Sequence, residues 1–231
     1  MCMNQFARFF TVFSLLALVG GGCVAADVDV DDDMDEMEEG EEDEADEVEE
    51  AVEAVMIEAG DYSVDLDGST IYWVGRKPGA AHNGTINLTE GALSVGEETA
   101  GTFVIDMDTI ENLDIESEVF RGSLVDHLKS DDFFSVEEFP TATFAITSME
   151  EQDADENYLV TGSLTLKGST QEVTFPAEVT AADAGYNLVA MFEIDRTLWG
   201  VVYGSESIVD SALDVIIEDM MTIELDLLLA S

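Results

Sequence analysis

The chain has 231 residues, enough for one sizeable domain with accessory segments, and its 53 acidic and 7 basic residues give a formal net charge of −46. This charge excludes nucleic-acid binding through a basic footprint and docking on an anionic membrane through a polybasic patch. The negative charge has two explanations: the protein works at high salt, which screens the charges, or the charge only keeps the protein soluble.

Residues 1–22 have the pattern of a secretory signal of the lipoprotein type. Arg8 precedes the apolar run Phe9–Val19, and the small residues Gly20–Gly22 lead directly to Cys23. The apolar run is too short to cross a bilayer as a mature helix. A cysteine after small residues resembles the bacterial lipoprotein box, which implies cleavage before Cys23 and acylation of its new amino terminus.

The cysteine content agrees with an anchor at Cys23. Cys2 and Cys23 are the only cysteines of the sequence, so cleavage leaves one thiol and no intramolecular disulfide. Several acyl chains on Cys23 would attach the protein stably to a membrane. We therefore expect export across the inner membrane and a periplasmic or cell-surface lipoprotein. The alternative is an ordinary signal peptide cut nearby, with Cys23 incidental.

Residues 23–59 are predicted to form an acidic, low-complexity linker. Residues 27–61 hold 20 acidic residues and no basic one, and such dense like charge does not favour a compact fold. We interpret the segment as a disordered spacer that holds a domain off the membrane. Carboxylates also suit Ca²⁺ or Mg²⁺, but the segment has no Asp-x-Asp-x-Asp-Gly loop, so the spacer is the preferred interpretation.

Residues 60–231 are predicted to form one all-β domain. Turn signals such as Asp67-Gly68 and Asn83-Gly84 separate runs in which apolar and polar residues alternate with a period of two. This alternation predicts antiparallel strands with an apolar inner face and a wet outer face. The large side chains assigned to the inner face are those of Trp73, Phe103, Phe144, Leu164, Phe175, Phe192, Leu225 and Leu227.

A single segment breaks the alternation. Residues 115–128 place four apolar side chains near helical spacing, which predicts a short helix capped by Asp114 or Ser117. About eight strands with one helix indicate a closed barrel or a sandwich. A closed barrel of this size has room for side chains or for one small ligand.

The stretch His127–Phe144 combines a charged loop, the aromatic pair Phe133-Phe134 and Pro140 before a strand. Because Pro140 lacks an N–H and disfavours helix in the residue before it, the chain is expected to become extended there. The two phenylalanines occupy a loop that would ordinarily be polar, so we expect an apolar surface to receive them.

This stretch and two later motifs resemble segments of the YceI-like lipid-binding domains. The later motifs are VTGSLTLKG at Val160–Gly168 and IDRTLWG at Ile194–Gly200. The three motifs occur in the family's order, and the resemblance covers residues 60–230. The segment Gly75–Gly84 resembles a subgroup start, GRKPxGxHxG, whose ligand could differ from an isoprenoid.

The resemblance implies a lipocalin-like, extended antiparallel barrel whose apolar tube binds a long isoprenoid or other lipid tail. A packed barrel without a cavity is the alternative, because alternation alone does not distinguish the two. The residues expected to contact the ligand are Trp73, His82, Phe103, Phe133, Phe134, Phe144, Phe175, Phe192, Arg196 and Trp199. Basic residues expected near a head group at the mouth are Arg76, His82, Arg121, His127 and Arg196, although pairing with neighbouring acids is the favoured role for any single one.

The sequence offers little for metal binding or catalysis. His82 and His127 are the only histidines, residues 60–231 contain no cysteine, and the chain has no HxxxH, CxxC or G-x-S-x-G motif. We therefore predict no metal, no cofactor and no enzymatic activity, but a carrier or store for a lipid or isoprenoid. The rivals are a solid-core interaction module on an anchored acidic spacer and a hydrolase with a carboxylate pair. Assembly as a homodimer stays open.

Overall fold

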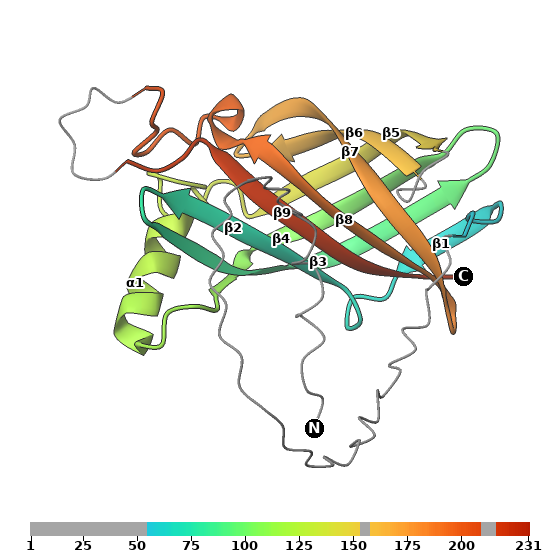
Figure 1. Cartoon of the computed structure of the whole chain (residues 1–231), viewed down its shortest axis with the longest axis horizontal. Helices are drawn as coiled ribbons and strands as arrows, with labels where there is room; N and C mark the ends of the chain where they lie inside the picture. The colour runs from blue at the N-terminus through green and yellow to red at the C-terminus, as the bar shows by residue number, and fades with distance from the viewer. Residues whose placement is uncertain (1–54, 153–157, 209–215) are drawn as a thin grey trace, which may run out of the picture. The chain divides into compact units, whose positions relative to one another are not determined.

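A computed structural model of the chain describes residues 55–152, 158–208 and 216–231. The predicted signal segment, Cys23 and most of the predicted linker lie outside these residues. The elements of the described part form one sheet with an α-helix at one end (Figure 1). In chain order they are β1 (Gly60–Val64), β2 (Thr70–Lys77), β3 (Ala80–Val95), β4 (Ala100–Asn112), α1 (Glu118–Lys129), β5 (Thr141–Glu151), β6 (Tyr158–Leu166), β7 (Ser169–Ala182), β8 (Gly185–Asp195), η1 (Arg196–Trp199) and β9 (Met220–Ala230).

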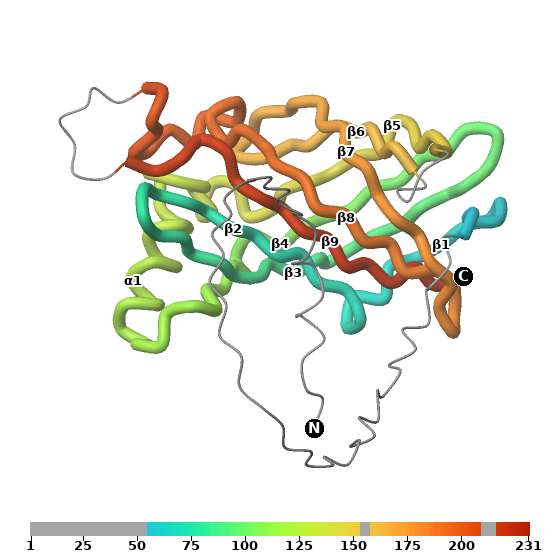
Figure 2. Tube along the Cα trace, in the orientation of Figure 1, coloured from blue at the N-terminus to red at the C-terminus, as the bar shows by residue number. Residues whose placement is uncertain are grey.

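The sheet closes on itself. Its strand order is β1-β3-β2-β9-β8-β7-β6-β5-β4, every pairing is antiparallel, and pairing of β3 with β4 joins the two sides. Figure 2 shows β9 running between β2 and β8. β2 pairs with β3 and β9 toward one end of the barrel, and β1 pairs with the same two strands toward the other. Nine strands therefore fill eight positions of a closed barrel, which confirms the predicted fold class.

The inner face carries the apolar residues of the alternating runs. Phe144 lies opposite Phe103 on β4 and opposite Leu164 on β6. On the other side of the barrel, Ile223 lies between Trp73 on β2 and Phe192 on β8. Cross-strand neighbours of this kind stabilise a sheet through contact of their side chains, so the core and the barrel wall depend on the same residues.

Helix α1 lies beside β4 at the end of the barrel opposite β1 (Figure 1). It begins at Glu118, three residues later than the start predicted at 115, and its N-cap Ser117 makes no side-chain capping bond. None of its residues is fully buried, and its Leu128 packs against the core from the barrel end. Among the described residues, neither helix has the length and the apolar run needed to cross a membrane.

Asp114 joins the start of β3 to the end of β4 instead of capping α1. One carboxylate oxygen lies 2.8 Å from Nδ1 of His82, and the other accepts bonds from the backbone N–H of Asn83 (2.8 Å) and from the amide of Asn112 (2.6 Å). Burial alone would raise the pKa of the Asp114 carboxyl, but the bonds from Asn83, His82 and Asn112 together hold that pKa below its usual value.

Replacing Asp114 with alanine is expected to lower the free energy of unfolding by about 2 kcal/mol near neutral pH. Because the pKa is lower in the folded state, this contribution is present above the unfolded value of about 3.9 and shrinks as pH falls through the folded value. Urea denaturation across a pH series measures it. Asp108→Ala, at a carboxylate whose side chain is 69% exposed, is the matched control. A difference between native protein and Asp114→Ala that stays constant into acid would contradict the assignment.

Candidate ligand-binding site

The barrel encloses a cavity of about 200 Å³. Its wall consists of apolar side chains apart from Gly75, Arg196 and Glu218. Inward residues such as Phe144 and Phe192 are only partly buried, because the cavity leaves part of their surface uncovered. The apolar lining comes from all strands except β1, from α1 and the loop after it, and from the segment before β9: Ile71, Trp73, Ile86, Leu88, Phe103, Ile105, Met107, Ile110, Leu128, Phe133, Phe134, Ala142, Phe144, Ile146, Val160, Leu164, Leu166, Val173, Phe175, Leu188, Phe192, Ile194, Ile217, Met221, Ile223, Leu225 and Leu227.

Three phenylalanines form an aromatic band on one side of the cavity wall. The rings of Phe175 and Phe192 stack with centroids 4.1 Å apart and planes 5° apart, and the ring of Phe144 lies 5.6 Å from that of Phe175. Gly162 on β6 leaves the space that Phe144 needs, since a Cβ there would lie 2.4 Å from Cζ of the ring. The rings thus pack against one another along the wall and leave the centre of the barrel open.

Gly162→Ala is expected to lower the free energy of unfolding by about 1–3 kcal/mol, because the added methyl group forces the Phe144 ring or the backbone of β5 to move. Gly75→Ala is the matched control: Gly75 is also a strand glycine, and no atom lies within 4 Å of the Cβ that it would gain. Urea denaturation of both variants makes the comparison. Equal stability of the two would show that the aromatic band does not need the glycine.

The first two sequence motifs meet at the end of the cavity beside α1, which we call the mouth. Phe133 is 7% exposed and lines the cavity with Phe134, so the apolar surface expected for this pair is the cavity itself. Lys167, in the two-residue turn between β6 and β7, donates from Nζ to the carbonyls of Asp131 (3.0 Å) and Phe133. Lys167 and Gly168 both have positive φ, 47° and 73°, as such a tight hairpin turn requires.

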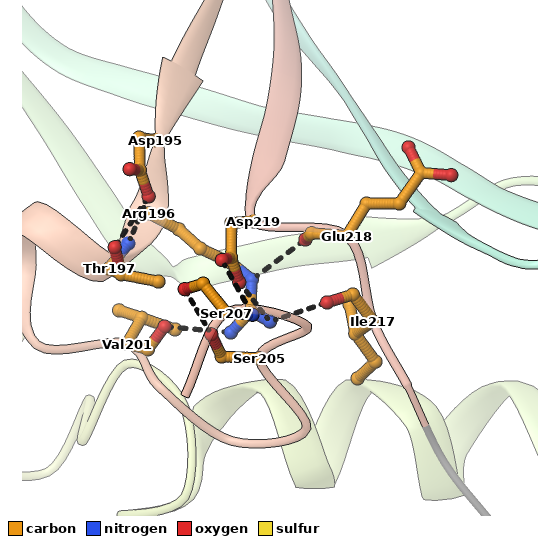
Figure 3. Close-up of polar contacts among 9 residues, drawn as sticks. All are labelled: Asp195, Arg196, Thr197, Val201, Ser205, Ser207, Ile217, Glu218 and Asp219. Carbon is orange, nitrogen blue, oxygen red and sulfur yellow. Dashed lines mark hydrogen bonds and ion pairs between the residues drawn. The ribbon is translucent and has the colours of Figure 1, made fainter. Parts of the chain in front are cut away.

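The third motif forms the other side of the mouth. Asp195 caps η1 by accepting from the backbone N–H of Thr197 at 2.9 Å. The next residue, Arg196, is 3% exposed, and its guanidinium lies 6.0 Å from the centre of the Phe133 ring. It donates to three backbone carbonyls of the mouth (Figure 3): Val201 at 2.7 Å, Ile217 at 3.1 Å and Glu218 at 3.1 Å.

Asp219 supplies the counter-charge for Arg196, with one carboxylate oxygen 3.7 Å from Nη2. Burial raises the pKa of the Asp219 carboxyl, but the hydroxyls of Ser205 and Ser207, the Ser207 N–H and Arg196 together hold it below its usual value. Burial also lowers the pKa of Arg196, against the opposing effect of Asp219. The one strongly buried cation of the wall is therefore neutralised, and it fastens two segments of the mouth together.

The structure brings eight of the ten predicted contact residues to the cavity wall. They are Trp73, Phe103, Phe133, Phe134, Phe144, Phe175, Phe192 and Arg196. His82 lies outside the wall, paired with Asp114. Trp199, the last residue of η1, is 2% exposed but does not line the cavity. Its Nε1 donates to the carbonyl of Leu164 at 2.9 Å.

The five basic residues predicted near a head group all have protein partners. Arg76 bonds to Thr222 at 2.7 Å and lies 3.8 Å from Glu193. The remaining partners are Asp114 for His82, the Ile115 carbonyl for Arg121, Asp132 for His127 and Asp219 for Arg196. Of these five, Arg196 alone lines the cavity.

Sequence reasoning missed two kinds of lining residue. Ile223 shares the alternating apolar face of β9 with Leu225 but was not among the predicted contact residues. Ile217 and Glu218 lie before β9, where no alternation indicates an inner face. In the part of the chain that the structure describes, no three His, Cys, Asp or Glu side chains come together as metal ligands.

A closed antiparallel barrel around an apolar cavity is the architecture of a binding protein for a small apolar ligand. Residues 62–229 match the YceI-like domain family, and the chain belongs to that family.

Individual relatives agree with this membership. The chain is 29% identical over 124 residues to Protein YceI of Escherichia coli O157:H7, which is 52% of this chain and 62% of that protein. It is 47% identical over 53 residues to UPF0312 protein plu2095 of Photorhabdus laumondii, which is 23% of this chain and 27% of that protein. The chain thus spans less than two thirds of the length of these curated relatives.

Two solved structures show the same fold. BcnA of Burkholderia cenocepacia superposes with a TM-score of 0.59 at 22% identity, covering 73% of this chain and 99% of that chain. A polyisoprenoid binding domain from Saccharophagus degradans superposes with a TM-score of 0.53 at 15% identity, covering 74% and 98%.

Proposed function

We propose that the protein binds the apolar tail of a lipid or polyisoprenoid inside its barrel and carries or stores it without chemical change. The observation that carries the proposal is the cavity, whose wall is apolar from the aromatic band to the mouth. The fold shared with a polyisoprenoid binding domain supports the same ligand class.

The apolar wall suits a tail because burial itself supplies the affinity. Each methylene removed from water contributes about 0.8 kcal/mol, and a preformed cavity does not have to be opened at the moment of binding. The mouth, where Arg196 and Glu218 interrupt the apolar wall, is the place for the polar end of such a ligand.

The proposal extends to the amino-terminal part of the chain. A cleaved signal at residues 1–22, an acyl anchor on Cys23 and a spacer at residues 23–59 would place the barrel domain of residues 60–231 near a membrane from which a tail can be taken. Membrane fractionation tests this arrangement: native protein is expected to sediment with membranes and Cys23→Ala is expected to stay in the supernatant.

Organic extraction of the purified protein followed by mass spectrometry tests the ligand. We expect a co-purifying lipid or isoprenoid, or saturable uptake of an added polyprenol. Protein that yields no extractable lipid and takes up no polyprenol would instead support a solid-core interaction module. Hydrolysis of the added lipid that disappears on a single Asp or Glu substitution would support the hydrolase.

A further inference from the structure

The cavity ends well before the barrel does. We call the end of the barrel opposite the mouth the base. On β6, β8 and β9 the lining residues nearest the base are Val160, Leu188 and Leu227. The next inward residues along these strands, Tyr158, Tyr186 and Leu229, do not line it. With Leu93 and Val179, which are 2% and 0% exposed, they form a layer that we call the floor.

A short segment before β1 lies against this floor from below. We call residues 55–59 the basal strap. Its Ile57 is 7% exposed and belongs to the core, and the backbone N–H of Val55 donates to the carbonyl of Val179 at 2.9 Å. The strap therefore contacts floor residues that come from different strands. It precedes residues 62–229, which match the family.

Three tyrosines hold the basal strap. The hydroxyl of Tyr158 accepts from the N–H of Ile57 at 2.9 Å, and the hydroxyl of Tyr186 accepts from the N–H of Glu58 at 3.1 Å. The hydroxyl of Tyr62 donates to the carbonyl of Glu58 at 2.8 Å. The rings of Tyr62 and Tyr186 meet edge to face at 5.6 Å. Tyr158 and Tyr186 are also floor residues, so their hydrogen bonds connect the strap to the floor.

We propose that the basal strap locks the floor of the cavity and so sets the greatest length of tail that the barrel accepts. The inference rests on the proposed function and adds a determinant of specificity to it. With the strap in place, Tyr158 and Leu229 are 5% and 1% exposed, and the tail must end above them. Release of the strap frees the space beneath the floor. Each pair of strand residues spans about 6.6 Å along the strand, which a strand tilt of about 40° reduces to about 5 Å of depth, roughly one further isoprene unit.

The double variant Tyr158→Phe/Tyr186→Phe tests the lock in the full chain. It keeps both rings and removes two of the three hydroxyls that hold the strap, those that accept from the N–H groups of Ile57 and Glu58. We expect faster hydrogen–deuterium exchange at the amides of Ile57 and Glu58. In competition among linear prenols of graded length, from farnesol upward, we expect the affinity for the first prenol that exceeds the native limit to rise about tenfold, the gain from burying about two further methylenes. Tyr72→Phe, on the outer face of β2, is the matched control and should change neither result.

A second variant reaches the floor directly. Leu229→Ala shortens a floor side chain and keeps the strap's hydrogen bonds to Val179 and the three tyrosines, and it should shift the length limit in the same direction. The proposal is overturned if the tyrosine variant exchanges at the native rate, or if it exchanges faster but keeps the native length limit. An unchanged length limit in Leu229→Ala overturns it as well. Failure of the native protein to bind any prenol would instead refute the proposed function, and the exchange data would still report whether the tyrosines hold the strap.

Discussion

Arg196→Leu is expected to lower the free energy of unfolding by about 3–5 kcal/mol, because it leaves Asp219 as a buried charge without its cation. It also leaves the carbonyls of Val201, Ile217 and Glu218 without their donor. The loss should be largest among single changes at the mouth, since Arg196 is 3% exposed and water does not replace its bonds.

Urea denaturation of the single and double variants separates the ion pair from the carbonyl bonds. Adding Asp219→Asn to Arg196→Leu removes the stranded charge and should restore about 1–2 kcal/mol. Arg76→Leu is the control: its side chain is 38% exposed and its acidic partner Glu193 is 56% exposed, so its loss should be about 1 kcal/mol or less. Equal losses for Arg196→Leu and Arg76→Leu would show that the buried network contributes no more than a surface pair.

Leu225→Trp is expected to weaken binding of a prenol about 50-fold while leaving the fold intact. Leu225 lies on the cavity wall, opposite Ile71 on β2 and Ala190 on β8. The indole ring would occupy space that a tail needs, and excluding about three methylenes at 0.8 kcal/mol each gives this loss. Because the ring grows into the cavity, we expect the free energy of unfolding to change by about 1 kcal/mol or less.

Fluorescence or calorimetric titration with geranylgeraniol measures the affinity. Glu224→Trp adds the same ring one residue away, on the outer face of the same strand, and should bind the prenol as the native protein does. If Leu225→Trp bound the prenol with native affinity, the tail would have to lie elsewhere than in the barrel.

The fold could be predicted because the same apolar residues determine both the strand alternation and the closure of the barrel. Every second side chain of β9, such as Leu225 and Leu227, is apolar and must be buried, and closing the sheet buries the apolar faces of all strands together. The same rule placed Phe103 and Phe144 on the inner face, and the pairing of β4 with β5 brings them opposite each other. Alternation depends only on the chain's period of two, so it can be read without knowing which strands are neighbours.

Contacts between residues far apart in the sequence could not be predicted in this way. His82 was assigned to the ligand because basic groups are rare here and suit a phosphate, yet it pairs with Asp114, which follows β4 and lies 32 residues away in the sequence. Arg196 lies at the wall as expected, but its role in fastening the mouth depends on carbonyls that carry no sequence signal. The basal strap falls inside the segment predicted as linker, because a single buried side chain, Ile57, gives no period to detect.

The shared barrel position of β1 and β2 has a consequence for the order in which the protein folds. Both strands pair with β9, so the first and last strands of the domain must meet before the ring is complete. Contacts of such long sequence separation slow the folding of β proteins, since a large loop must close first. The ring cannot close until β9 is in place, and until then the strand edges that it will cover remain exposed.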